Sequence, residues 1–267
     1  RDSVASRGLG DVYKRQPIKD FERLHGKLQF ATVSLAVGKP LMGTLDRALK
    51  IARRRKSPHI IISEEIRLTL LDWRYIIQLI GERPTFCDEL VPTLPTYQGF
   101  VDASKWGVGG VWFSGTKNLP PIVWFLKWPE EVQQRLVTDD NPHGDITIAE
   151  LELFGVFLQW LVLEQAVTAE DLERKSVAIW CDNLPAVAWL YKMRNSGSKF
   201  AARILRAFAI RLQHFRAAVP AIDHLSGIYN IMSDFASRKH TTNSTDFLTL
   251  FTSTFKPPQG DYWTLCT

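Results

Sequence analysis

The stretch FVDASKWGVGGVWF, residues 100–113, places one acidic residue, Asp102, inside an otherwise apolar segment. Residues 97–103 alternate in a way that predicts a strand with both faces covered. The glycines of residues 107–110 then allow the chain to turn back into a second strand. A carboxylate on a central strand costs on the order of several kcal/mol of desolvation unless a positive group meets it. We therefore expect a sheet that holds a metal ion beside Asp102.

The chain is long and apolar enough for one large domain or two modest ones, with 267 residues of which 45% are hydrophobic. Its 33 Lys and Arg against 28 Asp and Glu give a formal charge of +5, which permits a polyanionic partner without requiring one. The three cysteines, Cys87, Cys181 and Cys266, form no CxxC pair, so neither a disulfide framework nor a zinc site is expected. Reduced thiols favour an intracellular location, cytoplasm or nucleus. No apolar run reaches the roughly 18 residues of a membrane span, so no membrane partner is expected.

Four segments with different patterns divide the chain. Residues 1–16 have no sustained period, and we interpret them as a non-native or disordered tail. Residues 17–92 contain three amphipathic runs and predict a small helical module. Residues 93–240 read as three strands in series followed by alternating helices and strands, which predicts an α/β domain with a mixed sheet and flanking helices. Residues 241–267 are rich in Thr, Ser and Pro and are interpreted as a linker or tail, so we expect the chain to be a piece of a longer protein.

Four acidic residues occupy positions where charge is unusual. They are Asp102 in a strand, Glu150 in the first turn of a helix, Asp182 at a strand end and Asp234 early in the last helix. Two of them also have a purely structural explanation. Asp182 could cap the N-terminus of the following helix, and Asp234, in the first turn of its helix, could interact favourably with the helix dipole. If strands 97–103 and 176–182 lie adjacent and parallel, the four carboxylates meet. We assign Glu152 to the surface, because two residues on along a helix a side chain points elsewhere.

The composition of this set predicts which metal it binds. Carboxylate oxygens without His or Cys favour magnesium or manganese over zinc. Such a site holds two ions roughly 3.5 to 4 Å apart, one activating water and one stabilising the leaving oxygen of a phosphodiester. The expected cofactor is therefore Mg²⁺ or Mn²⁺, as two ions.

The acidic residues lie in four motifs, FVDASKWGVGG, ITIAELELFGV, IWCDNLPAV and HLSGIYNIMSDFASR. Together, in this order, these motifs resemble the ribonuclease H domain of a retroelement reverse transcriptase. The resemblance implies a ribonuclease H-like fold over residues 93–240, with a mixed five-stranded sheet and helices. It also implies hydrolysis of the RNA strand of an RNA–DNA hybrid with divalent metal. It assigns the catalytic and metal-binding roles to Asp102, Glu150, Asp182 and Asp234.

The same resemblance gives a role to His224, ten residues before Asp234. His224 is expected to assist proton transfer or product release, from a loop shaped by Ser226, Gly227 and Asn230. The alternative is a polar residue that simply ends a strand, since a single His is weak evidence.

Candidate contacts to nucleic acid lie near these motifs. Those for 2′-hydroxyl groups closely follow the metal aspartates: Ser104, Lys105 and Asn183. Those for DNA phosphates share one face of a predicted helix: Lys199, Arg203 and Arg206. A solvated helix face is an equally good explanation of the basic residues. Five tryptophans are expected to fill the core rather than stack on bases: Trp106, Trp112, Trp124, Trp160 and Trp180.

The helical part, residues 17–92, is similar, less specifically, to the thumb and connection region that precedes ribonuclease H in such polymerases. The closing SDFASR favours a tyrosine-recombinase-type or long-terminal-repeat retrotransposon. The remaining polymerase domains of the same polyprotein are then expected partners, and this chain alone is not expected to polymerise. Two alternatives remain: a catalytically silent ribonuclease H-like scaffold that positions template-primer nucleic acid, and another nuclease or transposase on the same kind of fold.

Overall fold

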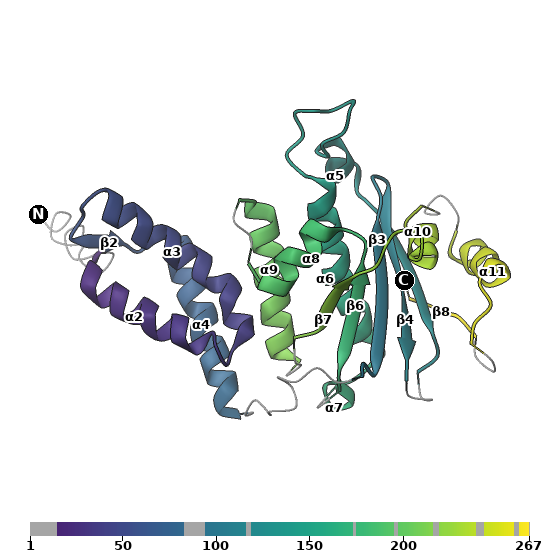
Figure 1. Cartoon of the computed structure of the whole chain (residues 1–267), viewed down its shortest axis with the longest axis horizontal. Helices are drawn as coiled ribbons and strands as arrows, with labels where there is room; N and C mark the ends of the chain where they lie inside the picture. The colour runs from purple at the N-terminus through teal and green to yellow at the C-terminus, as the bar shows by residue number, and fades with distance from the viewer. Residues whose placement is uncertain are drawn as a thin grey trace, which may run out of the picture. The chain divides into compact units, whose positions relative to one another are not determined.

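The computed structural model describes residues 15–82, 94–115, 119–172, 175–194, 197–215, 219–238, 243–258 and 262–266 (Figure 1). The chain divides into two compact units near residue 85, and a short stretch, Ala209–Gln213, groups with the first unit. The predicted boundary at residues 92 and 93 lies outside the described residues. None of the described helices is both long and apolar enough to cross a membrane.

The first unit is helical, with a small two-stranded sheet. Its elements are β1 (Arg15–Pro17), α2 (Ile18–Ala31), the 3-10 turn η1 (Ala36–Gly38), α3 (Lys39–Arg54), β2 (His59–Ile61) and α4 (Glu64–Glu82). The apolar period of the helices buries one stripe of side chains, including Leu41, Leu45 and Ile76. Arg15 and Gln16, which we assigned to the tail, belong to β1 and pair with β2 in an antiparallel register.

The second unit is an α/β structure with a mixed six-stranded sheet in the order β7-β6-β3-β4-β5-β8. Its strands are β3 (Tyr97–Ala103), β4 (Gly107–Ser114), β5 (Ile122–Lys127), β6 (Val177–Cys181), β7 (Ala221–His224) and β8 (Thr264–Cys266). Strands β3, β4 and β5 are antiparallel in series, while β6 runs parallel to β3 and β7 parallel to β6. The strand of Asp102 and the strand before Asp182 are therefore adjacent and parallel, which is the condition under which we expected the carboxylates to meet.

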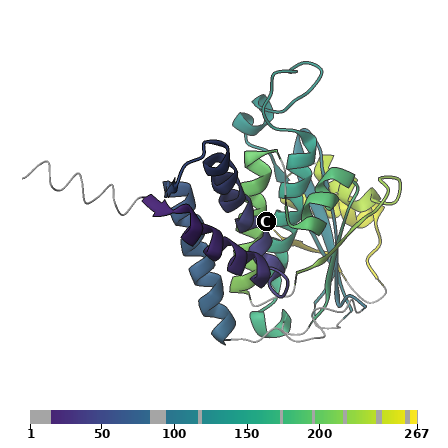
Figure 2. The same ribbon diagram turned by 60° about the vertical axis from the view of Figure 1, so that its left-hand side comes forward.

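Helices cover both faces of this sheet. Figures 1 and 2 show α6 and α8 on one face and α10 and α11 on the other. The helices of this unit are α5 (Glu130–Gln134), α6 (Ile148–Ala166), α7 (Ala169–Leu172), α8 (Leu184–Lys192), α9 (Lys199–His214), α10 (Ile231–Arg238) and α11 (Ser244–Thr254). Because α6 and α10 pack on opposite faces of the same strands, they deliver side chains to one region of the sheet from two sides.

The prediction of a linker or tail over residues 241–267 is wrong for the described part of that segment. Residues of α11 and β8 pack on the sheet, and β8 pairs with β5 as the sixth strand where five were expected. Phe247 and Phe251 are fully buried, and Phe255 packs against the same cluster. These three residues are spaced by four, which is a helical apolar stripe that the surrounding Thr and Ser obscure.

Four of the five tryptophans expected in the core are removed from water wholly or in part. Trp112, Trp124 and Trp160 are buried, and Trp180, half-buried, stacks on Phe100. The expectation is wrong for Trp106, which is 47% exposed. Trp106 lies in the tight turn between β3 and β4 rather than in a strand, and a turn at the sheet's end has no second layer to cover it.

Helix α10 lies directly on β4 because β4 has glycine where the two approach. A Cβ atom at Gly109 would lie 2.5 Å from the Cβ atom of Ala236 and 2.8 Å from the backbone nitrogen of Ser237. Gly109 is also the residue of β4 that pairs with Asp102 of β3. The close approach therefore sets the distance between α10 and the strand that carries Asp102.

We expect Gly109→Ala to lower the free energy of unfolding of the second unit by about 1–3 kcal/mol, because the added methyl group meets backbone that cannot move aside. Urea denaturation measures this change. The matched control is Gly115→Ala at the end of the same strand, where the nearest atom would lie at an ordinary 3.5 Å. Equal stability of the two variants would contradict the close packing of α10 on β4.

Candidate functional site

Asp102 is a buried carboxylate at the end of the central strand β3, with 5% of its surface exposed. Ser237 of α10 donates a hydrogen bond from Oγ to Asp102 Oδ2 at 2.5 Å. The pKa of Asp102 is raised to about 6, mainly by burial, which the Ser237 hydrogen bond opposes; the negative charges of Asp182 and Asp234 add to the rise, and Arg238 acts against it. The carboxylate is thus held in an environment that disfavours its charge.

Asp182 follows the last residue of β6 and is half-buried. Its pKa is raised, mainly by burial and also by Asp234, while His224 and Arg238 lower it. His224, the last residue of β7, lies with Nε2 at 3.1 Å from the backbone oxygen of Asp182. Because β6 and β7 are parallel neighbours, their ends bring Asp182 and His224 together as the sequence predicts.

Asp234, in the first turn of α10, forms an ion pair with Arg238 one turn later. Its Oδ1 accepts a hydrogen bond from Arg238 Nε at 2.6 Å. The charges of both residues act on Asp102 and Asp182. Three of the four predicted carboxylates therefore lie in one electrostatic group, with Arg238 as a cation at its edge.

Glu150 does not join this group, and its assignment to the metal site is wrong. Glu150 and Thr147 form a capping box at the start of α6, in which Glu150 Oε2 accepts from the Thr147 backbone nitrogen at 2.7 Å. Its other oxygen accepts a hydrogen bond from Ser198 Oγ. Both carboxylate oxygens are therefore used in fixing the helix start. The sequence contains the signal for this role, because Thr-Ile-Ala-Glu has the spacing of a capping box.

Glu152 takes the position predicted for Glu150. It is 3% exposed rather than at the surface, because α6 turns the side chain at position 152 toward the sheet. Burial raises the pKa of Glu152 well above its ordinary value, and the charges of Asp102 and Asp182 add to the effect. The backbone of Ala103 and the thiol of Cys181, with Sγ at 3.6 Å from Oε2, donate hydrogen bonds to its carboxylate.

We call Asp102, Glu152, Asp182 and Asp234 the carboxylate cluster. Ligand atoms of Glu152, Cys181 and Asp182 lie within 4.8 Å of one another, a spacing that can hold a metal ion. Burial raises the pKa of the Cys181 thiol, so this sulfur stays protonated and is a poor ligand at neutral pH. The donors that remain are carboxylate oxygens with raised pKa values, and this set suits a hard divalent cation such as Mg²⁺ or Mn²⁺.

The residues predicted to contact nucleic acid differ in what they can do. The side chain of Ser104 is not available for a contact, because it is buried and its Oγ donates to the Ser237 backbone oxygen at 2.9 Å. Asn183 caps α8, with Oδ1 accepting from the Ala186 nitrogen at 3.1 Å, so its amide oxygen is already used. The solvent-facing candidates of the set are Lys105 beside the cluster and, on α9, Lys199 and Arg203, with Arg206 half-buried.

Sequence reasoning missed Glu152, Ser237, Cys181 and Arg238. Glu152 was detectable, because recognising the Thr147–Glu150 capping box removes Glu150 and leaves Glu152 as the acidic residue of that motif. Ser237 and Cys181 had no local signal. Their positions beside the carboxylates follow from the packing of α10 and α6 on β3 and β6.

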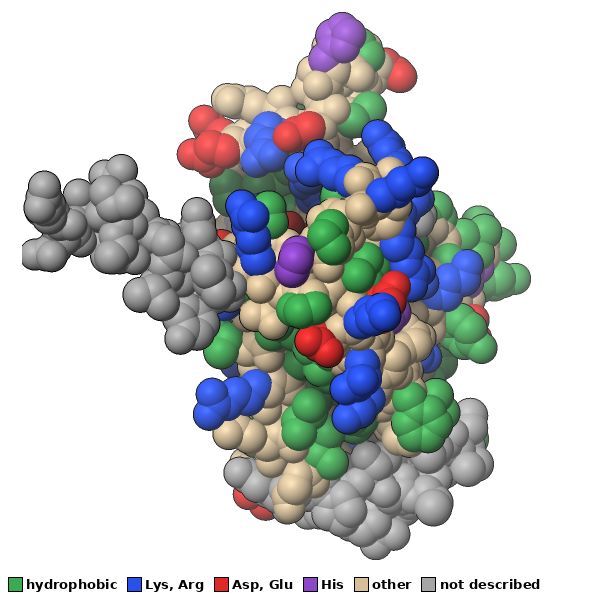
Figure 3. Space-filling view, turned by 90° about the vertical axis from the view of Figure 1, so that its left-hand side faces the viewer, with side chains coloured by type: hydrophobic (Ala, Val, Ile, Leu, Met, Phe, Trp, Pro, Cys, Tyr) green, Lys and Arg blue, Asp and Glu red, His purple; other side chains and the backbone are tan. Residues whose placement is uncertain are grey.

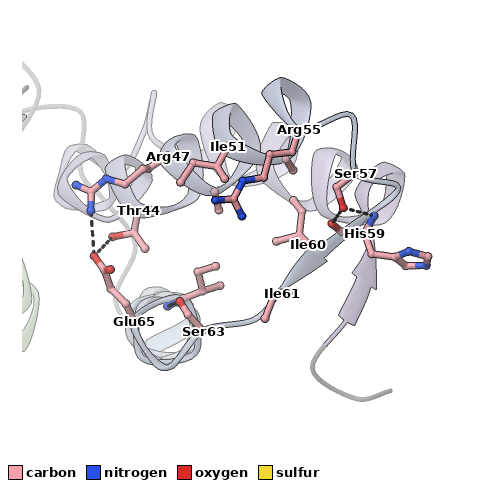
Figure 4. Close-up of a pocket in the computed structure, with 13 residues that line it drawn as sticks. Thr44, Arg47, Ile51, Arg55, Ser57, His59, Ile60, Ile61, Ser63 and Glu65 are labelled. Carbon is pink, nitrogen blue, oxygen red and sulfur yellow. Dashed lines mark hydrogen bonds and ion pairs between the residues drawn. The ribbon is translucent and has the colours of Figure 1, made fainter. Parts of the chain in front are cut away.

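The first unit has a separate groove, formed by one side of α3, by β2 and by the start of α4 (Figure 4). Its volume is about 270 Å³, with Ile51 and Ile61 partly exposed and Arg47 and Arg55 at its rim. Residues 15–82 carry 13 Lys and Arg against seven Asp and Glu, a net charge of +6. Figure 3 shows Lys and Arg side chains spread over the face that it looks onto. None of the predicted site residues lines the groove.

The fold and the site together define an α/β protein in which a carboxylate cluster, two of its members buried, lies where the ends of β3 and β6 meet α6 and α10. Comparison of the chain with family models, with curated proteins and with solved structures gives no match. The chemistry of the carboxylate cluster is therefore the basis for assigning a function.

The raised pKa of Asp102 predicts how stability depends on pH when no divalent cation is bound. The folded pKa of about 6 lies above the ordinary 3.8, so the folded state binds this proton more tightly than the unfolded chain. The free energy of unfolding should therefore rise as pH falls from about 7 toward 5, and Asp102 contributes about 1–1.5 kcal/mol to the rise over this range.

Asp102→Asn removes the buried charge and is expected to stabilise the protein near neutral pH in chelator while flattening its pH dependence. Urea denaturation at about pH 7.5 and about pH 5.5 measures both effects. Asp139→Asn, in an exposed loop, is the matched control and should change neither. Destabilisation by Asp102→Asn at neutral pH would contradict the buried, unpaired carboxylate described above.

Proposed function

We propose that the second unit is a metal-dependent endonuclease that hydrolyses the RNA strand of RNA–DNA hybrids. The observation that carries this proposal is the meeting of four carboxylates from β3, α6, the end of β6 and α10, three of them with raised pKa values. Like charges held close together cost stability, most of all where two of them, Asp102 and Glu152, are buried, and a chain that keeps four such groups together has a use for their combined charge. Binding divalent cations at a phosphodiester is the use that oxygen ligands fit best.

Asp102, Glu152 and Asp182 are the residues that would hold the ions, with Asp234 completing the set when it separates from Arg238. When bound, divalent ions would supply activation of the attacking water and stabilisation of the leaving oxygen. Ser237 and the backbone of Ala103 orient two of the carboxylates through hydrogen bonds. Such bonds hold the two carboxylates in place before substrate arrives.

His224 is positioned to move a proton at this site. Its Nε2 donates to the Asp182 backbone oxygen, which fixes the ring at the edge of the carboxylate cluster. Its Nδ1 makes no hydrogen bond to a described residue, and the side chain is exposed to solvent. An imidazole held in this way can protonate a leaving group or exchange a proton with water.

The resemblance of the four motifs to retroelement ribonuclease H supports the choice of RNA–DNA hybrid as substrate. A mixed sheet with three antiparallel strands in series and two parallel additions beside β3 agrees with the ribonuclease H-like fold that the resemblance implies. In this proposal the cationic first unit is the thumb or connection region, and the other polymerase domains of the polyprotein are its partners. Lys105 and the exposed basic residues of α9 would supply phosphate contacts that weaken as salt increases.

Cleavage of a labelled RNA–DNA hybrid by the whole chain tests the proposal. The reaction is run with magnesium, with manganese and with chelator, beside single-stranded and double-stranded RNA. Metal-dependent cutting of the RNA strand of the hybrid alone is the expected result. Binding of the hybrid without cutting in either metal would favour a silent scaffold, and cutting of every substrate would favour a nuclease of another class.

Glu152→Gln should reduce kcat for hybrid cleavage by about 100-fold or more, because it removes a buried negative charge at the reacting phosphodiester. The matched control is Glu150→Gln two residues away, since a glutamine keeps the capping box with Thr147 intact. We expect Glu150→Gln to retain activity within about threefold. The reverse outcome, with Glu150→Gln inactive and Glu152→Gln active, would restore the assignment made from the sequence.

A further inference from the structure

The chain between β7 and α10 forms a tight turn, residues 226–229, that is fixed at both ends. On one side the Leu225 nitrogen donates to the Cys181 backbone oxygen at 3.0 Å. On the other side Asn230, which is 2% exposed, donates from Nδ2 to the Val101 backbone oxygen at 2.9 Å. Two successive turn hydrogen bonds close the segment, from the Tyr229 nitrogen to the Ser226 oxygen and from the Asn230 nitrogen to the Gly227 oxygen. The turn therefore has little freedom to rearrange.

This turn is attached to the carboxylate cluster itself. Val101 and Cys181, its two anchor points, directly precede Asp102 and Asp182 in the chain. A Cβ atom at Gly227 would lie 3.0 Å from Asp182 Oδ2, so the turn's backbone passes against that carboxylate. The exposed side chains of the turn therefore have a fixed position relative to the carboxylate cluster.

What the turn presents is two large apolar side chains. Ile228 is 75% exposed and Tyr229 is 71% exposed. The Tyr229 hydroxyl has no hydrogen-bond partner among the described residues. Neither side chain contributes to the core, and a rigid turn that exposes adjacent apolar groups beside a site is typical of a contact surface.

We propose that Ile228 and Tyr229 contact the sugars and base edges of the bound hybrid in its minor groove and position the RNA strand over the carboxylate cluster. This inference rests on the proposed function. The minor groove of a hybrid is wide and shallow and displays 2′-hydroxyl groups, so a short turn with an aromatic ring can enter it. The Tyr229 ring and the Ile228 side chain would pack against ribose, and the Tyr229 hydroxyl would form a hydrogen bond with a base edge or a 2′-hydroxyl group. Since the turn is already ordered, binding would not carry the entropy cost of ordering it.

The test measures hybrid binding and cleavage by the whole chain with Tyr229→Ala, Tyr229→Phe and Tyr262→Ala. Tyr262 is the matched control, because it is 70% exposed and lies just before β8, at the opposite edge of the sheet from β7. Affinity is followed by fluorescence anisotropy of a labelled hybrid in chelator, and KM and kcat are followed in magnesium. Thermal unfolding of each variant checks that the fold is retained.

We expect Tyr229→Ala to raise Kd and KM about tenfold, with a smaller change in kcat, because an aromatic contact to nucleic acid is lost. Tyr229→Phe should recover most of the lost affinity, since the ring is kept, and Tyr262→Ala should bind like the unaltered protein. If the unaltered protein cleaves the hybrid and Tyr229→Ala has the same Kd and KM, this inference fails while the proposed function stands. If the unaltered protein neither binds nor cleaves the hybrid, the proposed function fails and this inference with it.

Discussion

The burial of the Asp102 carboxylate at the end of the central strand is the constraint on which the second unit depends. A negative charge in this position is unfavourable because it is removed from water. The surrounding elements reduce this free-energy cost with a hydrogen bond and a nearby cation. Ser237 of α10 donates a hydrogen bond to it, and Arg238 lowers its pKa from a distance. Helix α10 reaches Asp102 only because Gly109 of β4 lets the helix lie on the strand. One close backbone approach therefore determines how the Asp102 carboxylate is supported.

Within one turn of helix α6, one glutamate stabilises the start of the helix and another belongs to the carboxylate cluster. Glu150 closes the capping box with Thr147 and so fixes where the helix begins. Fixing the start also fixes the rotation of the helix, and this rotation turns Glu152 toward Ala103 and Cys181. The two carboxylates differ by two positions in sequence, yet one orients the helix and the other is buried against the sheet. Replacing Glu150 would remove half of the capping box, and replacing Glu152 would remove one carboxylate from the cluster.

The part of the sheet away from the cluster is stabilised by aromatic packing. Phe247 and Phe251 of α11 cover the α10 side of the sheet, and Trp263, just before β8, packs edge to face against Phe251 with ring centroids 5.0 Å apart. This cluster covers the sheet with apolar surface where α10 ends. The favourable burial there offsets the unfavourable burial of charge near Asp102. Stability and the candidate site are thus supplied by different regions of the same sheet.

The sequence by itself determined the order and type of the main elements, because alternation, helical period and glycine turns are local signals. It also predicted that Asp102, Asp182, Asp234 and His224 would lie near one another, since each lies at the end or start of an element whose neighbours were predictable. It misassigned Glu150, because the Thr147–Glu150 capping box, a local signal, was overlooked; the burial of Glu152 against the sheet is decided by the rotation of the helix. It missed α11 because the surrounding Thr and Ser obscure a local apolar stripe, and it missed β8 and the role of Ser237 because these depend on contacts with distant strands. Only the tertiary structure decides which face of a helix meets which strand, because that choice depends on side chains distant in the chain packing together.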